Sequence, residues 1–298
     1  MMKKAAGYVS LCLIWGTTWM AIKIGLQDLT PFFSLGIRYL LASVFLAGYL
    51  YLKEGKLSFR IKHWKLTIAI TLFNYILPYC LVYWGEQYIY SDLTSVIFSS
   101  LPLNISLLTL FIFREERFSA KDAVGIFIGF AGIFTIFSEP LIKNSGFNLP
   151  GMISVYLASV SAALVTLIIR KSKEKFHPIK VNLVPVITTG ILITGISLLL
   201  EDVGRSRLTV SAFFAVSYLA MFGTVFAFAV YFWLIRRIKL SLVASISYIT
   251  PLVAIFAGWV FLKENLSLFQ IIGASLVLSG VFLTLRKGKK PPPTPVPE

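Results

Sequence analysis

Long apolar runs separated by short polar turns occupy most of the chain. A helix that spans the hydrocarbon of a bilayer needs about 20 apolar residues, and runs of that length recur from near the start of the chain to residue 285. We predict ten membrane-spanning helices, over residues 6–27, 32–52, 66–88, 93–113, 122–138, 151–170, 179–200, 212–235, 240–262 and 268–285. The pattern predicts an all-α integral membrane protein without a soluble domain.

The chain contains an internal repeat. Residues 102–132 read P-L-N-I-S-L-L-T-L-F-I-F-R-E-E-R-F-S-A-K-D-A-V-G-I-F-I-G-F-A-G, and residues 251–280 read P-L-V-A-I-F-A-G-W-V-F-L-K-E-N-L-S-L-F-Q-I-I-G-A-S-L-V-L-S-G. Glu116 recurs as Glu264, 148 residues later (264 − 116 = 148). We predict a first five-helix repeat over residues 1–138, a linker outside the cytoplasm over 139–150, a second repeat over 151–286, and a disordered, Pro-rich cytoplasmic tail over 287–298.

Spaced glycines follow the acidic turn in both copies of the repeat. Gly125, Gly129 and Gly132 lie in the fifth predicted helix, and Gly273 and Gly280 lie in the tenth. Small residues let two membrane helices approach closely. We therefore predict tight helix packing at these positions.

Composition and charge support a membrane protein and give its orientation. The chain is 57% hydrophobic, only 14% charged, and has a mean hydropathy of +0.82. Most of its 28 Lys and Arg residues fall in the turns on the same side as the N-terminus, which predicts cytoplasmic N- and C-termini. The exceptions are Lys143, Arg205, Arg207 and Lys263 on the opposite side, and Lys23 and Arg38 within helices. The net charge of +15 then reflects topology and anionic lipid, and gives no reason to infer nucleic acid.

The orientation makes the repeat an inverted one. Five helices separate equivalent positions, so the turn with Glu116 is predicted to be cytoplasmic and the turn with Glu264 to face outside. In transporters, inverted repeats meet near the bilayer midplane and rock about a site held between them. The sequence therefore favours a secondary transporter.

The first two predicted helices carry buried cations. Trp15, Trp19 and Lys23 are spaced four apart, with Thr18 beside them, and so share one helix face. This face is either an aromatic packing surface with Lys23 extending to the headgroups, or a cavity wall whose ammonium binds an anion. Arg38 in the second helix is either a structural clamp or a substrate contact.

The third predicted helix is the most polar. Tyr75, Tyr79, Tyr83 and Glu86 form one stripe at helical spacing, with Asn74 at its margin. Hydroxyl groups at this depth need partners, which either neighbouring helices or an aqueous cavity would supply. Lys23 and Glu86 lie at a similar depth, and we predict that they pair; with Arg38 they form the candidate charge or coupling residues.

Proline interrupts the fourth and ninth helices at matching places. Pro102 and Pro251 each free a backbone carbonyl in mid-span. A kink alone would explain each proline, but their matching positions favour a pair of functional hinges. The complete set of candidate substrate-binding residues is Trp15, Thr18, Trp19, Lys23, Asn74, Tyr75, Tyr79, Tyr83, Ser99, Asn104, Tyr156 and Tyr248.

Several of these motifs resemble one family. The segments W-G-T-T-W-M-A-I-K, R-Y-L-L-A, S-L-P-L and R-E-E-R-F-S, repeated in the second half as Y-I-T-P-L and K-E-N-L-S, are similar to EamA-type members of the drug/metabolite transporter superfamily. The resemblance covers roughly residues 6–286. It implies two inverted five-helix repeats around a cavity lined by the first, third, fourth, sixth, eighth and ninth helices, and export of amino acids, metabolites or drugs across the inner membrane. Residues 161–163, S-A-A, depart from the tryptophan-like position of the family pattern.

Other chemistry has little support. His63 and His177 have no partners at ligand spacing, so we expect no metal and no cofactor. Cys12 and Cys80 fall inside helices as apolar fillers, and no phosphate-binding loop is present. We do not expect an enzyme, although a membrane enzyme and a channel stay as alternatives.

The charges of the candidate site bound the substrate. Two buried cations against one carboxylate favour a neutral, zwitterionic or anionic metabolite such as an amino acid, with a multidrug or lipophilic-compound exporter as the alternative. The expected partners are a small-molecule substrate and membrane lipid, and the expected assembly is a monomer or weak homodimer.

Overall fold

The computed structural model describes residues 2–55, 64–111, 120–143, 149–172, 179–235, 237–238 and 246–285. Every regular element in this part of the chain is helical. The elements are α1 (Met2–Gly25), α2 (Pro31–Glu54), α3 (Trp64–Ile70), η1 (Thr71–Ile76), α4 (Leu77–Gly85), α5 (Ser91–Phe98), α6 (Leu101–Phe111), α7 (Ala120–Lys143), α8 (Leu149–Lys171), α9 (Lys180–Leu200), η2 (Val203–Arg205), α10 (Val210–Tyr218), η3 (Leu219–Phe226), α11 (Ala227–Ile235), α13 (Ile246–Ala257), η4 (Gly258–Leu262) and α14 (Leu268–Leu285).

The predicted all-helical membrane fold is confirmed. Seven helical segments of the described chain are long and apolar enough to cross a membrane: Lys3–Gly25, Pro31–Glu54, Trp64–Gly85, Ser91–Phe111, Leu149–Ile169, Lys180–Leu200 and Val210–Tyr231. Three shorter apolar helices, Ala123–Ile136, Ile249–Leu262 and Leu268–Leu283, occupy the other three predicted positions.

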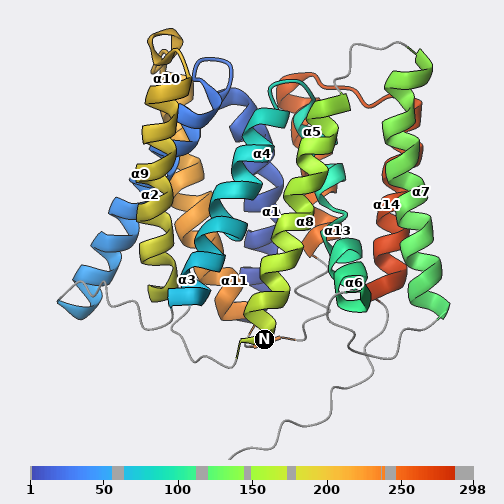
Figure 1. Cartoon of the computed structure of the whole chain (residues 1–298), viewed down its shortest axis with the longest axis horizontal. Helices are drawn as coiled ribbons and strands as arrows, with labels where there is room; N and C mark the ends of the chain where they lie inside the picture. Colours follow the sequence, from blue (N-terminus) through green and yellow to red (C-terminus); the bar gives the residue numbers. More distant parts are fainter. Residues whose placement is uncertain are drawn as a thin grey trace, which may run out of the picture.

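The two halves of the chain are inverted relative to each other. The spans run between two ends of the bundle, one of which carries the N-terminus (Figure 1). We call the other the distal end; it carries the connections over residues 26–30, 86–90, 201–209 and 263–267. Helix α1 opens the first half and runs toward the distal end, whereas α8 opens the second half and runs away from it (Figure 1). The opposite directions follow from the odd number of helices in each half.

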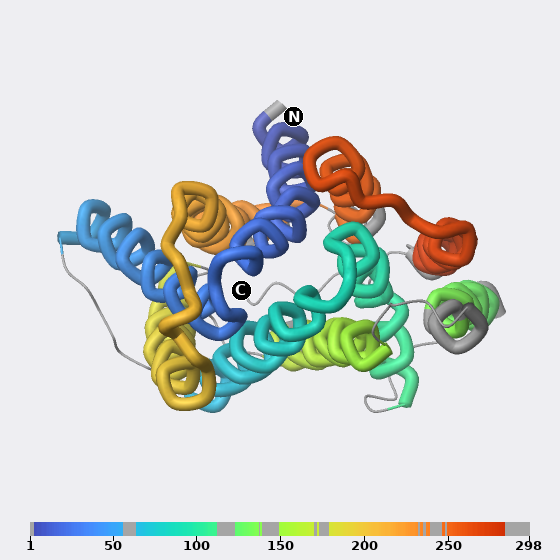
Figure 2. The backbone as a smooth tube through the Cα atoms, turned by 90° about the horizontal axis from the view of Figure 1, so that it is seen from above, coloured from blue at the N-terminus to red at the C-terminus, as the bar shows by residue number. Residues whose placement is uncertain are grey.

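Equivalent helices of the two halves pair at the edges of the bundle. The second spans, α2 and α9, pack together at one edge, and the fifth spans, α7 and α14, pack together at the other (Figure 2). The glycines make the second pairing possible: a Cβ atom on Gly132 would lie 2.6 Å from the Gly273 carbonyl oxygen, and one on Gly280 would lie 2.5 Å from that of Gly125. The predicted tight packing is confirmed.

The remaining six spans occupy the middle of the bundle (Figure 2). Helix α1 packs against α13 and α10, and α8 packs against α4, α5 and α6. These pairings join the first half to the second, so a shift between the halves must move α1 and α8 against their neighbours.

The two prolines that sequence analysis matched differ in the structure. The fourth span is broken at Ser99–Ser100, between α5 and α6, and Pro102 is the second residue of α6. Proline is well tolerated there, because its missing N–H group would have no partner in the first turn. Pro251 lies inside the continuous helix α13. Only the first of the two positions therefore coincides with a break in its helix.

The third and eighth spans each contain a π-helical stretch that sequence analysis did not foresee. Segments η1 and η3 begin at Thr71 and Leu219, 148 residues apart (219 − 71 = 148), which is the offset of the repeat. In η3 the Thr224 hydroxyl donates to the carbonyl of Leu219, five residues back, at 3.0 Å. Pro78 follows η1 and has no N–H group for the preceding turn. Wide turns of this kind occur frequently at functional sites.

Candidate functional site

Arg38 lies at the centre of a polar cluster deep in the bundle. Its side chain is only 1% exposed. Nε donates to the Thr224 hydroxyl at 3.2 Å, and Nη1 donates to the Tyr83 hydroxyl at 3.3 Å. The guanidinium carbon lies 4.7 Å from the ring centre of Tyr79 and 5.5 Å from that of Tyr39. We call these residues, with Tyr75, the Arg38 cluster.

The guanidinium has no acidic counterpart in the described part of the chain. No carboxylate of the described residues forms an ion pair with Arg38, and its second Nη atom donates to none of them. Removing a cation from water is costly, and aromatic faces and hydroxyls compensate only part of that cost. The cluster therefore has unused donors and a positive charge, which an anionic group would satisfy.

The tyrosine stripe faces the protein interior. Tyr75 and Tyr83 are fully buried, and Tyr79 is half-buried. The Tyr75 hydroxyl donates to the Asn182 side-chain oxygen in α9 at 2.8 Å. Tyr39 places its ring edge-on to Tyr75 and Tyr79, at 5.5 and 5.8 Å between ring centres. Neighbouring helices thus supply the partners of Tyr75 and Tyr83.

The face predicted on the first helix packs against the fourth and eighth spans. Trp15 contacts Phe228 and Tyr231 of α11, with ring centres 5.9 and 5.2 Å apart. Trp19 contacts Phe98 of α5 at 5.2 Å. The Thr18 hydroxyl donates to the carbonyl of Trp15 in its own helix. This face therefore joins α1 to both halves.

Lys23 and Glu86 are neighbours, but their side chains do not form the predicted ion pair in this structure. The Lys23 ammonium donates instead to the backbone oxygens of Glu86 and Ile89, at 2.6 and 2.8 Å. The last carbonyls of a helix have no partner within it and carry partial negative charge, so an ammonium is stabilised there. Lys23 thus neither extends to the headgroups nor lines an open wall; it connects α1 to the end of α4.

A second polar cluster joins α6 to α8. The Asn104 amide donates to the Ser159 hydroxyl at 2.6 Å and to that of Ser100 at 3.3 Å, while its oxygen accepts from the Tyr156 hydroxyl at 3.1 Å. The Ser99 hydroxyl, just after α5, donates to the Val96 carbonyl in that helix. Of the other candidates, Asn74 is half-buried, and the side chain of Tyr248 lies outside the described residues.

Small residues of α8 bond directly to the backbone of the third span. The Ser161 hydroxyl donates to the Phe73 carbonyl at 3.1 Å, and that of Ser154 donates to the Leu81 carbonyl at 2.8 Å. A Cβ atom on Gly85 would lie 2.7 Å from the Gly151 carbonyl oxygen. At 161–163, where the sequence departs from the family pattern, α8 thus uses a small polar residue for close packing.

Two glutamates at the distal end cap helices of the other half. Glu264 accepts hydrogen bonds from the Ser91 N–H at 3.1 Å, the Ser91 hydroxyl at 2.6 Å and the Asp92 N–H at 3.4 Å, at the start of α5. Glu201 accepts from the N–H groups of Phe32 and Phe33, both at 3.0 Å, at the start of α2. The first N–H groups of a helix have no internal partner and favour negative charge. The Glu264 of the repeat is therefore a helix cap; Glu116 lies outside the described residues.

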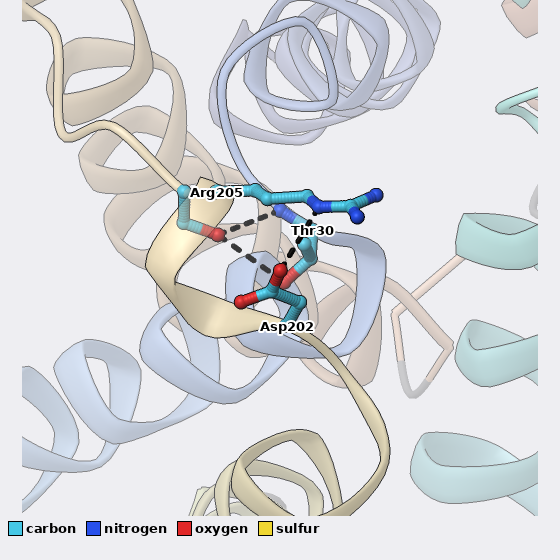
Figure 3. Close-up of polar contacts among 4 residues, drawn as sticks. Thr30, Asp202 and Arg205 are labelled. Carbon is cyan, nitrogen blue, oxygen red and sulfur yellow. Dashed lines mark hydrogen bonds and ion pairs between the residues drawn. The ribbon is translucent and has the colours of Figure 1, made fainter.

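The distal connections form two shallow pockets that meet at Arg205. A pocket of about 500 Å³ is lined by Gln27, Asp28, Gly204, Arg205 and Arg207. A second, of about 260 Å³, is lined by Thr30, Pro31, Phe32, Trp84, Gln87, Tyr88, Glu201, Asp202 and Arg205. Arg205 pairs with Asp202 at 2.9 Å, and Ser206 bonds to Thr30, which holds this connection over the start of α2 (Figure 3). Neither pocket is lined by a residue of the tyrosine stripe.

The candidate residues predicted from the sequence do not include four residues that complete the two clusters: Tyr39, Ser159, Asn182 and Thr224. Asn182 and Thr224 are polar residues within apolar spans, and such residues usually mark functional or interhelical contacts. Tyr39 follows Arg38 directly, and adjacent residues do not share a helix face. That signal could have identified Asn182 and Thr224, but not Tyr39.

Comparisons with known proteins agree with this architecture. The model of the EamA-like transporter family matches residues 4–138 and 149–286. The chain is 26% identical over 283 residues to the uncharacterized transporter YoaV of Bacillus subtilis, covering 95% of this chain and 97% of that protein. It is 28% identical over 282 residues to the uncharacterized inner membrane transporter YedA of Escherichia coli K12, covering 92% and 88%.

A solved crystal structure shows the same fold. It has a TM-score of 0.65 at 16% identity, and the match covers 95% of this chain and 97% of that one. Two family matches, one to each inverted half, and full-length relatives named as transporters lead to the same conclusion. The chain belongs to the EamA-like transporter family of the drug/metabolite transporter superfamily, and it is a secondary transporter, not an enzyme.

Proposed function

We propose that this transporter exports small metabolites that carry a carboxylate, amino acids foremost, by alternating access across the cytoplasmic membrane. The observation that carries the proposal is the buried Arg38, which has no acidic partner among the described residues. A substrate carboxylate would supply the missing charge and accept hydrogen bonds from the unused N–H groups. The planar guanidinium suits this, because its donors match the geometry of a carboxylate.

The position of Arg38 supports coupling of binding to movement. Its hydrogen-bond partners come from both halves: Tyr83 from α4 in the first and Thr224 from η3 in the second. A ligand bound there would contact both halves and could therefore favour one arrangement of them over another. The two π-helical stretches border the same cluster, since Thr224 lies in η3 and Tyr75 in η1.

The proposal includes an orientation and an assembly. The excess of Lys and Arg toward the N-terminal side supports an orientation with both termini in the cytoplasm and the distal end outside. The halves are the two five-helix repeats over 1–138 and 151–286, joined by 139–150 and followed by the tail over 287–298. Pro102 and Pro251 act as hinges, and the protein works as a monomer or weak homodimer.

Counterflow in proteoliposomes tests the substrate class. Proteoliposomes that contain the purified protein are loaded with an unlabelled L-amino acid. Uptake of the labelled amino acid is then compared with uptake of the labelled amine that lacks its carboxylate. We expect exchange of the amino acid and little exchange of the amine. Exchange of lipophilic cations alone would overturn the proposal.

Variants of Arg38 test the site. Arg38→Met should lower amino-acid exchange by about 10- to 100-fold, the equivalent of one or two charge-assisted hydrogen bonds, and Arg38→Lys should retain part of it. Thermal stability should be unchanged or raised in Arg38→Met, because an apolar side chain removes an unpaired buried charge. Lys53→Met, which removes an exposed cation from the same helix, is the matched control. If Arg38→Met does not fold, Tyr83→Phe takes its place as the test, because it removes only a single hydroxyl from the Arg38 cluster.

A further inference from the structure

Glu86 is a fully buried carboxyl group to which no described residue donates a hydrogen bond. Its side chain is 0% exposed, and neither Oε atom has a hydrogen-bond partner among the residues that the structure describes. Burying a carboxylate costs far more than burying any neutral polar group unless donors surround it. The residue lies immediately after α4, and a helix C-terminus carries partial negative charge that disfavours an anion further.

The charged and titratable groups around Glu86 do not offset this. Two cations face Glu86: Lys23 from α1 and Arg38 from α2. Glu264 faces it from the connection after η4, and Tyr83 faces it from α4. Lys23 already donates to two carbonyls, and Arg38 to two hydroxyls. Glu264, which caps α5 beside Asp92, adds negative charge. The surroundings therefore favour a neutral carboxyl group.

We propose that Glu86 is the proton-binding site that couples transport to the proton gradient. In the structure seen here the carboxyl group holds its proton. When the O–H bond breaks, the proton passes to water at the distal end, and a carboxylate remains beside Lys23. The Lys23 ammonium then leaves the carbonyls of Glu86 and Ile89 and pairs with that carboxylate.

This exchange of partners has a consequence for the whole bundle. Lys23 lies in the last turn of α1, and α1 packs against α13 and α10 of the second half. A change in where Lys23 binds at the end of α4 therefore shifts α1 against the second half, near the boundary that alternating access must move. The inference rests on the proposed transport function and adds its driving ion.

The local chemistry favours a proton over a metal cation. Sodium or a divalent ion requires several oxygen ligands, and the described residues contain no group of three or more His, Cys, Asp or Glu side chains that could hold a metal. The neighbouring ammonium of Lys23 would also repel a cation. A proton needs only one carboxyl oxygen.

Infrared difference spectroscopy tests proton binding without any substrate. The full-length protein in phospholipid vesicles is titrated from acid to alkaline pH, and the C=O band of protonated carboxyl groups is recorded. We expect a buried-carboxyl band that disappears on alkalinisation and is absent in Glu86→Gln. Asp202→Asn, which removes an exposed carboxylate at the same end, is the control and should keep the band. The proposal would be overturned if Glu86→Gln kept every carboxyl band of the wild type, or if sodium displaced the band.

The partner exchange has its own readout. In Lys23→Met the carboxylate would form without its ammonium, so the band should persist to a pH higher by about one unit or more. An unchanged titration in this variant would show that Lys23 does not receive the carboxylate, and would overturn that step.

Transport provides the second arm. With the amino acid identified by counterflow, a pH gradient should drive its accumulation in the wild type. Glu86→Gln should abolish accumulation but keep gradient-free counterflow within about twofold, and Glu86→Asp should restore part of the accumulation. Gradient-driven accumulation by Glu86→Gln would overturn the inference. If no amino acid is exchanged, the proposed substrate class fails and the infrared result alone decides on Glu86.

Discussion

Two buried glutamates at the distal end, Glu264 and Glu86, differ in which end of a helix they meet. Glu264 lies at the start of α5 and accepts three hydrogen bonds there. Glu86 lies at the end of α4 and accepts none from the described residues. A helix N-terminus supplies donors and partial positive charge, and a C-terminus supplies acceptors and partial negative charge. The same side chain thus has three donors at the start of a helix in one position, and at the end of a helix in the other it has none among the described residues.

Two further residues follow the same rule. Glu201 caps the start of α2, and the Lys23 ammonium binds the Glu86 carbonyl at the end of α4 and the Ile89 carbonyl in the connection that follows. These charges complement the helix ends that they contact. Glu86 is the exception in this set, and it is also the residue to which we assign a changing protonation state.

The largest expected effect on stability is at Glu264. Glu264→Ala leaves the first N–H groups of α5 without an acceptor in a buried place, which should lower the free energy of unfolding by roughly 3 kcal/mol. The measurement is a denaturant titration of the protein in mixed micelles. A loss no larger than that in Glu86→Gln would break the contrast between the two helix ends.

A slightly smaller loss is expected at Glu201. This carboxylate also caps a helix, but at a more exposed place, so Glu201→Ala should cost about 2 kcal/mol. Glu201→Gln should recover part of that loss, because its amide oxygen can still accept from the start of α2. The difference between the melting temperatures of the two variants in detergent would measure how much of the cap depends on an acceptor oxygen at residue 201.

Lys23 tests the opposite helix end. Lys23→Met removes the donor from the Glu86 carbonyl at the end of α4 and from the Ile89 carbonyl just beyond it. The loss should be about 1 kcal/mol, since water at the distal end can replace part of the interaction. Lys23→Arg keeps a cation and should lose less. Intrinsic tryptophan fluorescence during heating would report it. Equal losses in the two variants would show that packing, and not charge, holds α1 to α4.

The smallest effect is expected at Glu86 itself. Glu86→Gln is nearly isosteric with a protonated carboxyl group, so at acid pH it should change the free energy of unfolding by less than about 0.5 kcal/mol. At alkaline pH the wild type must either ionise the buried group or retain its proton at a cost, and the variant should then be the more stable of the two. Thermal melts of both proteins across pH would detect the crossing; parallel curves would contradict it.

Local patterns in the sequence determined the membrane fold. The length of apolar runs predicted ten spans, because hydrocarbon thickness sets the length of a helix that crosses it. The offset of 148 residues between Glu116 and Glu264 predicted two halves, and five helices in each made them inverted. Helical spacing placed Tyr75 and Tyr83 on one face, and that face is buried. All of these depend on properties of one helix or one repeat.

Contacts between distant helices were decided only by the tertiary structure. Hydropathy does not specify how far each helix is rotated, so it could not show that Arg38 meets Thr224 or that Lys23 binds backbone oxygens instead of a carboxylate. Nor could it show that Glu264 caps α5, because that bond joins residues 173 positions apart. The partner of each of these side chains depends on which donors and acceptors remain unsatisfied once the helices have packed. Only the assembled bundle determines those donors and acceptors.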